Sequence, residues 1–174
     1  MPTIIFLLIN IALLCTSSMS LAQPQDQQQV MNIEADQLKI DEKKGSSTYS
    51  GHVKISRGSL LIKGDKVMLQ SAHNNGLEYI HIIGKPASFK QLNDQQQLIS
   101  AQAQELVYRN SNGILTLTKD AVLVQNKNTF RAEKIIYNTQ TNVVQAGQND
   151  NASSGETKRV FITIHPDTNT TNTP

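Results

Sequence analysis

The sequence predicts an all-β protein built from bent antiparallel strands, and three observations support this prediction. Residues that alternate between apolar and polar, rich in Thr, Val and Ile, occupy positions 48–55, 115–123 and 160–164. Turn signals rich in Gly and Asn separate such segments, at positions 44–45, 74–76 and 110–113. No window of 11 or more residues beyond position 22 has the apolar spacing of a helix.

The segment from Met1 to Ala22 predicts an export signal. An apolar run from Ile4 to Leu14 is followed by small and polar residues. Ser20 and Ala22 fit the narrow pockets of a signal peptidase, so cleavage is expected after Ala22. The run is shorter than the roughly 20 apolar residues that cross a bilayer. No Lys or Arg precedes it, and an uncleaved membrane anchor is therefore the alternative.

The rest of the chain is predicted to be one folded domain with polar flanks. Residues 23–30 form a Gln-rich flexible leader, residues 31–166 the domain, and residues 167–174 a disordered tail. The only cysteine, Cys15, lies in the export signal. The exported chain therefore has no thiol for a disulfide, a zinc–thiolate site or a nucleophile.

Composition and motifs exclude several function classes. The 16 basic and 14 acidic residues leave a formal charge of +2, which gives no basic field for a nucleic acid. Nucleophile elbows, phosphate loops and zinc-protease motifs are absent from the sequence. The four histidines, His52, His73, His81 and His165, are scattered and lack the spacing of metal ligands. We therefore expect no metal and no cofactor.

An eight-residue template recurs four times along the chain. Its copies begin at Ile33, Ile62, Ala101 and Phe130. Each copy reads apolar, any, Ala or Gly, polar, any, apolar, any, apolar. The first pair of copies aligns with the second pair without a gap, positions 35–69 on positions 103–137, which indicates an internal repeat.

The template describes a bent strand. One extra residue interrupts its alternation, and in a straight strand this would place Leu38 on the opposite face from Ile33. A bulge or corner at Asp36-Gln37 restores the face. Four such strands describe a sheet folded around an inside, as in a jelly roll or a β-solenoid. Lys119 stands where the first repeat has Gly51, so a differently built corner is expected there.

Acidic residues recur at the predicted bends, namely Asp36, Asp65 and Glu133. We interpret them as bend formers that hydrogen-bond their own backbone, because each stands at the same structural point of its unit. Paired carboxylates also perform acid–base catalysis, so a glycosidase-like β-helix is the enzyme alternative.

The template and the alternating segments predict an inward apolar stripe. This stripe is either the closed core of an ordinary sandwich or the lining of a groove, and the residue pattern fits both. A greasy ligand such as an acyl chain would gain about 0.8 kcal/mol per buried methylene there. The predicted stripe consists of Ile33, Leu38, Ile40, Tyr49, Val53, Ile55, Ile62, Val67, Leu69, Phe89, Leu106, Tyr108, Leu115, Leu117, Ala121, Leu123, Phe130, Ile135 and Tyr137.

Six short motifs follow one another in the predicted domain, at residues 33–37, 49–53, 64–67, 84–89 (Gly-Lys-Pro-Ala-Ser-Phe), 132–137 and 158–160. Each motif alone is unspecific. Their order over residues 31–166, behind an export signal, resembles the LptA (OstA-like) family of periplasmic lipopolysaccharide-transport proteins.

The resemblance implies a twisted β-jelly roll with open ends, whose stripe residues line a lipid-binding groove. It implies a non-enzymatic bridge that carries lipopolysaccharide across the periplasm, with copies stacked head to tail. The implied partners are lipopolysaccharide, an inner-membrane LptC-like protein at the N-terminal edge and an outer-membrane LptD-like translocon at the C-terminal edge. Unpaired strand edges favour such stacking. The expected edge residues are Met31, Ile33, Val160, Ile162 and Ile164.

Two alternatives remain open at this stage. The absence of a positively charged residue before the apolar run is compatible with a membrane-anchored LptC-like relative in the same pathway. The second alternative is a structural β protein with a closed, dry core and no lipid.

Overall fold

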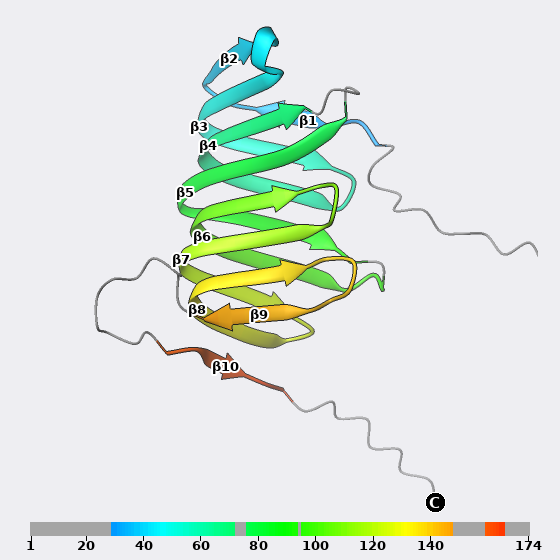
Figure 1. Cartoon of the computed structure of the whole chain (residues 1–174), viewed down its shortest axis with the longest axis vertical. Coiled ribbons are helices and arrows are strands. Elements are labelled where there is room, and N and C mark those ends of the chain that lie inside the picture. The colour runs from blue at the N-terminus through cyan, green and yellow to red at the C-terminus, as the bar shows by residue number, and fades with distance from the viewer. Residues whose placement is uncertain (1–28, 72–75, 94, 148–158, 166–174) are drawn as a thin grey trace, which may run out of the picture.

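A computed structural model shows an all-β fold over residues 29–71, 76–93, 95–147 and 159–165, which are the residues that the structure describes (Figure 1). These residues contain one 3-10 helix, η3 (Glu42–Lys44), and ten strands. The strands are β1 (Asn32–Glu34), β2 (Gln37–Asp41), β3 (Ser46–Arg57), β4 (Leu60–Ser71), β5 (Leu77–Leu92), β6 (Leu98–Arg109), β7 (Ile114–Gln125), β8 (Asn128–Asn138), β9 (Val144–Gly147) and β10 (Phe161–Thr163).

Several predictions of the sequence fall outside the described residues. The export signal, most of the leader and the tail at 167–174 are among them. In the described part of the chain, no helix has the length and apolar character that crossing a membrane requires.

All these strands belong to one antiparallel sheet, in which consecutive strands from β2 to β9 are also sheet neighbours. The order is β1-β3-β4-β5-β6-β7-β8-β10, with β2 also paired to β3 and β9 also paired to β8. This meander confirms the predicted class and strand direction. Figure 1 shows the consequence, because each long strand passes around the molecule and the ribbons stack along its vertical axis.

The long strands bend where their pairing register is interrupted. The interruptions lie at residues 51–52, 64–65, 84–86, 103–104 and 119–120. They form one corner that runs across the whole sheet, and they include the small residues of the template at Gly64 and Ala103. A Cβ atom on Gly64 would lie 2.8 Å from Ile82 Cγ2 and 2.9 Å from the Ile83 carbonyl oxygen. The prediction that small residues mark a corner is therefore confirmed.

The corner divides the sheet into two half-sheets that face each other. Half-sheet 1 runs from β2 to β9, and half-sheet 2 runs from β1 to β10. Side chains from the two half-sheets form one buried cluster. The rings of Phe89 in half-sheet 2 and Tyr108 in half-sheet 1 lie 5.5 Å apart between centroids. The architecture is thus a jelly roll around a common core.

The internal repeat predicted from the sequence is present in the pairing register. Tyr49 of β3 lies opposite Val67 of β4, and at the equivalent positions of the second repeat Leu117 of β7 lies opposite Ile135 of β8. The corners also correspond. Gly51 and His52 have φ angles of 79° and 44°, and the matching Lys119 and Asp120 have 66° and 54°. The expectation of a differently built corner at Lys119 is therefore wrong, because Lys119 adopts the left-handed conformation despite its side chain.

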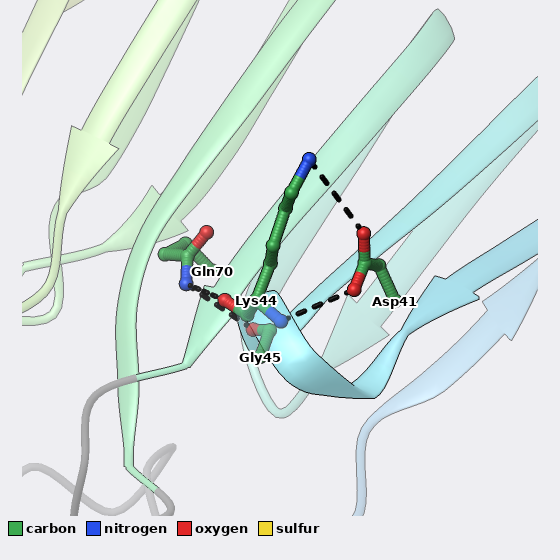
Figure 2. A network of polar contacts seen from close by, with 4 residues as sticks. All are labelled: Asp41, Lys44, Gly45 and Gln70. Atoms are coloured by element: carbon green, nitrogen blue, oxygen red, sulfur yellow. Dashed lines mark hydrogen bonds and ion pairs between the residues drawn. The ribbon is translucent and has the colours of Figure 1, made fainter.

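The connection from β2 to β3 is anchored to β4 by one amide side chain (Figure 2). Gln70 Nε2 donates hydrogen bonds to the carbonyl oxygens of Lys44, at 2.7 Å, and Gly45, at 3.3 Å. The Lys44 backbone N–H donates to Asp41 Oδ1 at 3.1 Å. Gly45 ends the 3-10 helix with a φ of 59°, a conformation that suits glycine. These contacts hold the turn beside the edge strand β2 in place.

Candidate functional site

The inward residues of the two half-sheets form three continuous apolar rows. Residues directly opposite each other on antiparallel strands share one face, so the pairing register defines each row. Row 1 of half-sheet 1 is Leu38, Tyr49, Val67, Ile82, Leu106, Leu117, Ile135 and Ala146. Row 2 of half-sheet 1 is Ile40, Ser47, Leu69, Ile80, Tyr108, Leu115, Tyr137 and Val144. Row 3, in half-sheet 2, is Ile33, Ile55, Ile62, Phe89, Ala101, Leu123, Phe130 and Ile162.

The rows contain nearly all the residues that the sequence assigned to the inward stripe. Val53 and Ala121, the two others, are buried near the corner of half-sheet 2. The sequence missed Ile80 and Ile82 of β5, which are both fully buried. Their alternation with Tyr79 and His81 was the available signal. The structure therefore brings the predicted residues together on one interior.

Burial changes systematically along each row. The central members, from Val67 to Ile135 in row 1, are fully buried. Three of the six row ends are exposed, with Leu38 at 56%, Ile40 at 58% and Ile162 at 53%, and the other three, Ile33, Val144 and Ala146, are partly buried. Leu38 and Ile40 lie in the predicted rows but are not enclosed, because β2 is an edge strand with no described strand beyond it. The apolar interior therefore emerges on the surface at both ends of the roll.

The middle of the interior is filled by the protein's own side chains. Phe89, Leu117, Leu123 and Tyr137 all have no exposed surface. The stripe is thus a packed core along most of its length in this conformation, and an open lining only at its ends. A ligand in the middle would have to replace contacts between the two half-sheets.

Each end of the roll offers two strand edges. Among the described strands, β1 in the predicted edge at residues 31–34 pairs only with β3, and β10 in the predicted edge at 159–164 pairs only with β8. Val160, Ile162 and Ile164 are exposed, whereas Met31 and Ile33 are partly buried against the core. The sequence missed the second edge at each end, formed by β2 and β9. Such unpaired edges are templates for strand addition.

A cluster of amides joins the two half-sheets where their strands end in hairpin turns. We call it the rim clasp, and it consists of Asn93, Gln125, Tyr137 and Asn142. Asn142 Oδ1 accepts hydrogen bonds from Tyr137 Oη at 2.8 Å, Asn93 Nδ2 at 3.2 Å and Gln125 Nε2 at 3.4 Å. Asn93 and Gln125 belong to half-sheet 2, and Tyr137 and Asn142 to half-sheet 1. The clasp therefore closes the rim near the C-terminal end.

Among the described ionisable residues, the corner brings a histidine beside a carboxylate. His52 Nδ1 lies 2.8 Å from Asp36 Oδ2, and both side chains are exposed. This hydrogen bond to Asp36, followed by the charge of Asp36, raises the pKa of His52 above its usual value of 6.5. The Asp36 carboxylate thus contacts His52 across the corner, which differs from the predicted bond to its own backbone. The described residues contain no cluster of three or more metal-ligating side chains.

Comparison with known proteins identifies the family. The family model for the LptA/(LptD N-terminal domain) LPS transport protein matches residues 32–143. Lipopolysaccharide export system protein LptH of Pseudomonas aeruginosa is 34% identical over 133 residues, which cover 76% of each chain. Lipopolysaccharide export system protein LptA of Escherichia coli K12 is 30% identical over 156 residues, which cover 89% of this chain and 81% of that protein.

A solved structure agrees with the sequence relatives. The crystal structure of LptH, described as the LptA-homologous periplasmic component of the lipopolysaccharide transport device of Pseudomonas aeruginosa, has a TM-score of 0.74 and 30% identity. The match covers 82% of this chain and 100% of that one. The bent sheet, the order of the motifs and these matches agree, and the chain belongs to the LptA/LptD N-terminal domain family of lipopolysaccharide-transport proteins.

Proposed function

We propose that this protein is a non-enzymatic bridge that carries lipopolysaccharide through the periplasm, from an inner-membrane complex to an outer-membrane translocon. Acyl chains lie along the apolar rows, and the sugars and phosphates remain in water. The observation that carries this proposal is the continuation of the rows from a buried middle to exposed ends at Leu38, Ile40 and Ile162. An ordinary closed core has no reason to extend to both surfaces of the molecule.

Loading of a lipid requires the two half-sheets to separate. The central row residues are fully buried, so acyl chains replace contacts such as that between Phe89 and Tyr108. Each methylene that leaves water contributes about 0.8 kcal/mol, which offsets the lost contacts between half-sheets. The protein supplies no energy for directed movement, because a ligand shifts an equilibrium only by its differential affinity. Direction therefore comes from the partner that loads the lipid.

Copies of the chain assemble head to tail in this proposal. The edges β1 and β2 of one copy pair with β10 and β9 of the next, so that the apolar rows continue from copy to copy. At the two ends of the stack, the N-terminal edge meets an LptC-like protein and the C-terminal edge meets an LptD-like translocon. Backbone hydrogen bonds between edge strands provide the affinity, and the exposed side chains Leu38, Ile40 and Ile162 provide the specificity.

The proposed location is the periplasm, reached through cleavage of the export signal after Ala22. In the alternative, a membrane-anchored LptC-like protein, residues 1–22 are not cleaved. Sequencing of the N-terminus of the protein from cells distinguishes the two, because a cleaved chain begins at Gln23.

Photo-crosslinking from two neighbouring positions tests the proposal. A photoreactive residue at Leu38 lies in row 1, and the same residue at Lys39 lies on the opposite face of β2, because successive side chains alternate. We expect lipopolysaccharide adducts from position 38 and few from position 39, together with lipid A in native mass spectra of the purified protein. Absence of lipid in both measurements would favour a structural β protein.

A further inference from the structure

Arg57 has a buried polar atom without a hydrogen-bond partner. It is the last residue of β3, and its Nε is buried and unsatisfied. The acidic residue nearest to it on the neighbouring strand β1, Glu34, is already paired with Lys54 at 2.8 Å. In the described part of the chain, no ion pair to Arg57 is formed. A buried N–H of a charged group costs free energy unless an acceptor completes it.

An open cavity adjoins this arginine at the N-terminal end of half-sheet 2. Its volume is about 480 Å³, and it is lined by Gln29, Val30, Asn32, Ser56, Arg57 and Gly58. Among the described residues of the lining, Arg57 is the one charged side chain. Asn32 and Ser56 lie opposite each other on the outer face of half-sheet 2 and add neutral hydrogen-bond donors, so the cavity extends around the rim from Arg57. This composition suits an anionic ligand with several acceptor oxygens.

The position of Arg57 relative to row 3 matches the layout of an amphipathic lipid. Val53, Ile55 and Arg57 alternate along β3 and therefore share the inward face, and Arg57 lies opposite the buried Leu60. Arg57 follows Ile55 by two residues, which corresponds to roughly 7 Å along a strand. An acyl chain on row 3 thus has its polar head beside the guanidinium at the rim.

We propose that Arg57 binds a phosphate group on the sugar head of the carried lipid, at the N-terminal end of the roll. The guanidinium presents fixed N–H donors that match phosphate oxygens, and the contact completes the buried Nε–H. This inference rests on the proposed function, because it assigns the head-group contact of the same lipid. It places the phosphate site at the edge that receives lipid from the preceding partner.

Binding of two lipids to two variants tests this proposal. Affinities of the purified protein are measured for lipid A with two phosphates and for the same lipid after enzymatic removal of both. We expect Arg57→Gln to weaken binding of the phosphorylated lipid about tenfold, which is the factor that corresponds to about 1.4 kcal/mol, and to leave the dephosphorylated lipid unaffected. Lys54→Gln removes the same charge at a nearby position of β3 and is expected to change neither affinity. Equal losses for both lipids in Arg57→Gln would overturn the proposal.

Two further readouts separate the possible failures. Wild-type protein that binds neither lipid refutes the carrier function itself, whereas binding without phosphate discrimination refutes only the role of Arg57. The Arg57 Nε–H resonance reports on the source of the phosphate. We expect the phosphorylated lipid to shift it and inorganic phosphate at the same concentration to leave it in place, and an equal shift by both would refute recognition of the lipid head group.

Discussion

Asn142 accepts a hydrogen bond from Asn93 at 3.2 Å, although the two residues are 49 positions apart and belong to opposite half-sheets. Asn142 adopts a φ of 59°, which asparagine tolerates better than most residues. Asn93 is only 7% exposed, and its own Oδ1 accepts from the backbone N–H groups of Gln95 and Gln97. A buried amide, Asn93, and a partly buried one, Asn142, thus connect the two walls of the roll.

Removal of the shared acceptor should destabilise the fold. We expect Asn142→Ala to lower the free energy of unfolding by about 1–3 kcal/mol, because three donors lose this acceptor and two of them, Asn93 and Tyr137, are buried residues. Asn142→Asp keeps an acceptor oxygen and should retain most of the stability. Urea denaturation of both variants measures the effect, and identical midpoints for wild type and Asn142→Ala would contradict it.

Fixing the clasp chemically should block lipid loading. Cys15, the only cysteine of the sequence, lies in the predicted export signal, so a chain that begins at Gln23 has none. Asn93→Cys combined with Asn142→Cys then offers a unique pair for a short, reducible thiol crosslinker. We expect the crosslinked protein to lose most lipid binding and to regain it on reduction, because loading requires the half-sheets to separate.

The matched control places both thiols on one side of the rim. Asn93 Nδ2 donates to Gln97 Oε1 at 3.2 Å, and both residues belong to one turn of half-sheet 2. A crosslink in Asn93→Cys/Gln97→Cys therefore does not connect the two half-sheets. This variant should bind lipid with or without the crosslink. Equal binding by both crosslinked pairs would show that separation at this rim is not needed.

Replacement by Asp should destabilise the fold strongly at a buried row residue and weakly at an exposed one. Phe89 is fully buried, and Phe89→Asp should unfold the protein, at a cost above about 4 kcal/mol.

Leu38 lies at the exposed end of its row, and Leu38→Asp should change the free energy of unfolding by less than about 0.5 kcal/mol. It should nevertheless weaken head-to-tail assembly in light scattering. Gln37→Asp adds the same charge on the other face of β2, and assembly as weak as that of Leu38→Asp would argue against a specific contact.

The pKa of His52 should depend on the neighbouring Asp36. The hydrogen bond to Asp36 raises the pKa of His52 in the folded state, so the pair stabilises the fold below the usual pKa of 6.5. This stabilisation is lost as the pH rises through the raised pKa of His52. NMR titration should give a midpoint above 6.5 in wild type and a lower one in Asp36→Asn. Coinciding midpoints would refute the coupling.

The backbone at Lys119, at the corner in the second repeat, is strained, and glycine at this position should relieve the strain. Lys119 has a φ of 66°, and the left-handed conformation costs a residue with a side chain about 1–2 kcal/mol. Lys119→Gly should therefore stabilise the protein by about 0.5–1 kcal/mol after the entropy of glycine is subtracted. Gly51→Ala is the mirror experiment and should destabilise, because the added Cβ would lie 2.8 Å from Asp36 Cβ. A lower thermal midpoint for Lys119→Gly would contradict this account.

The sequence predicts the bends and the rows because both depend on local pattern. A slip in alternation beside a small residue, as at Gly64, predicts a corner and thereby assigns Val67 and Leu69 to the interior. The template does not identify Ile80 and Ile82, because the corner of β5 extends over positions 84–86 and does not fit it.

Exposure at the ends and contacts across the rim do not follow from the sequence. Leu38 and Val67 occupy equivalent template positions, yet one is 56% exposed and the other fully buried, because only the neighbouring strands differ. Asn142 lies in a turn whose composition is that of any polar turn, and its partner Asn93 is far away in the chain. Such contacts depend on how distant hairpins align in space.

Because of the internal repeat, the length of the molecule can change while its terminal strands stay the same. One period contributes four strands to each wall, since position 37 in β2 corresponds to position 105 in β6. At the usual spacing between strands, one more copy would lengthen the roll by about 19 Å and leave the outermost strands unchanged. Duplication of an internal segment can therefore change the span of such a protein in steps of fixed length, without altering the edge strands at either end.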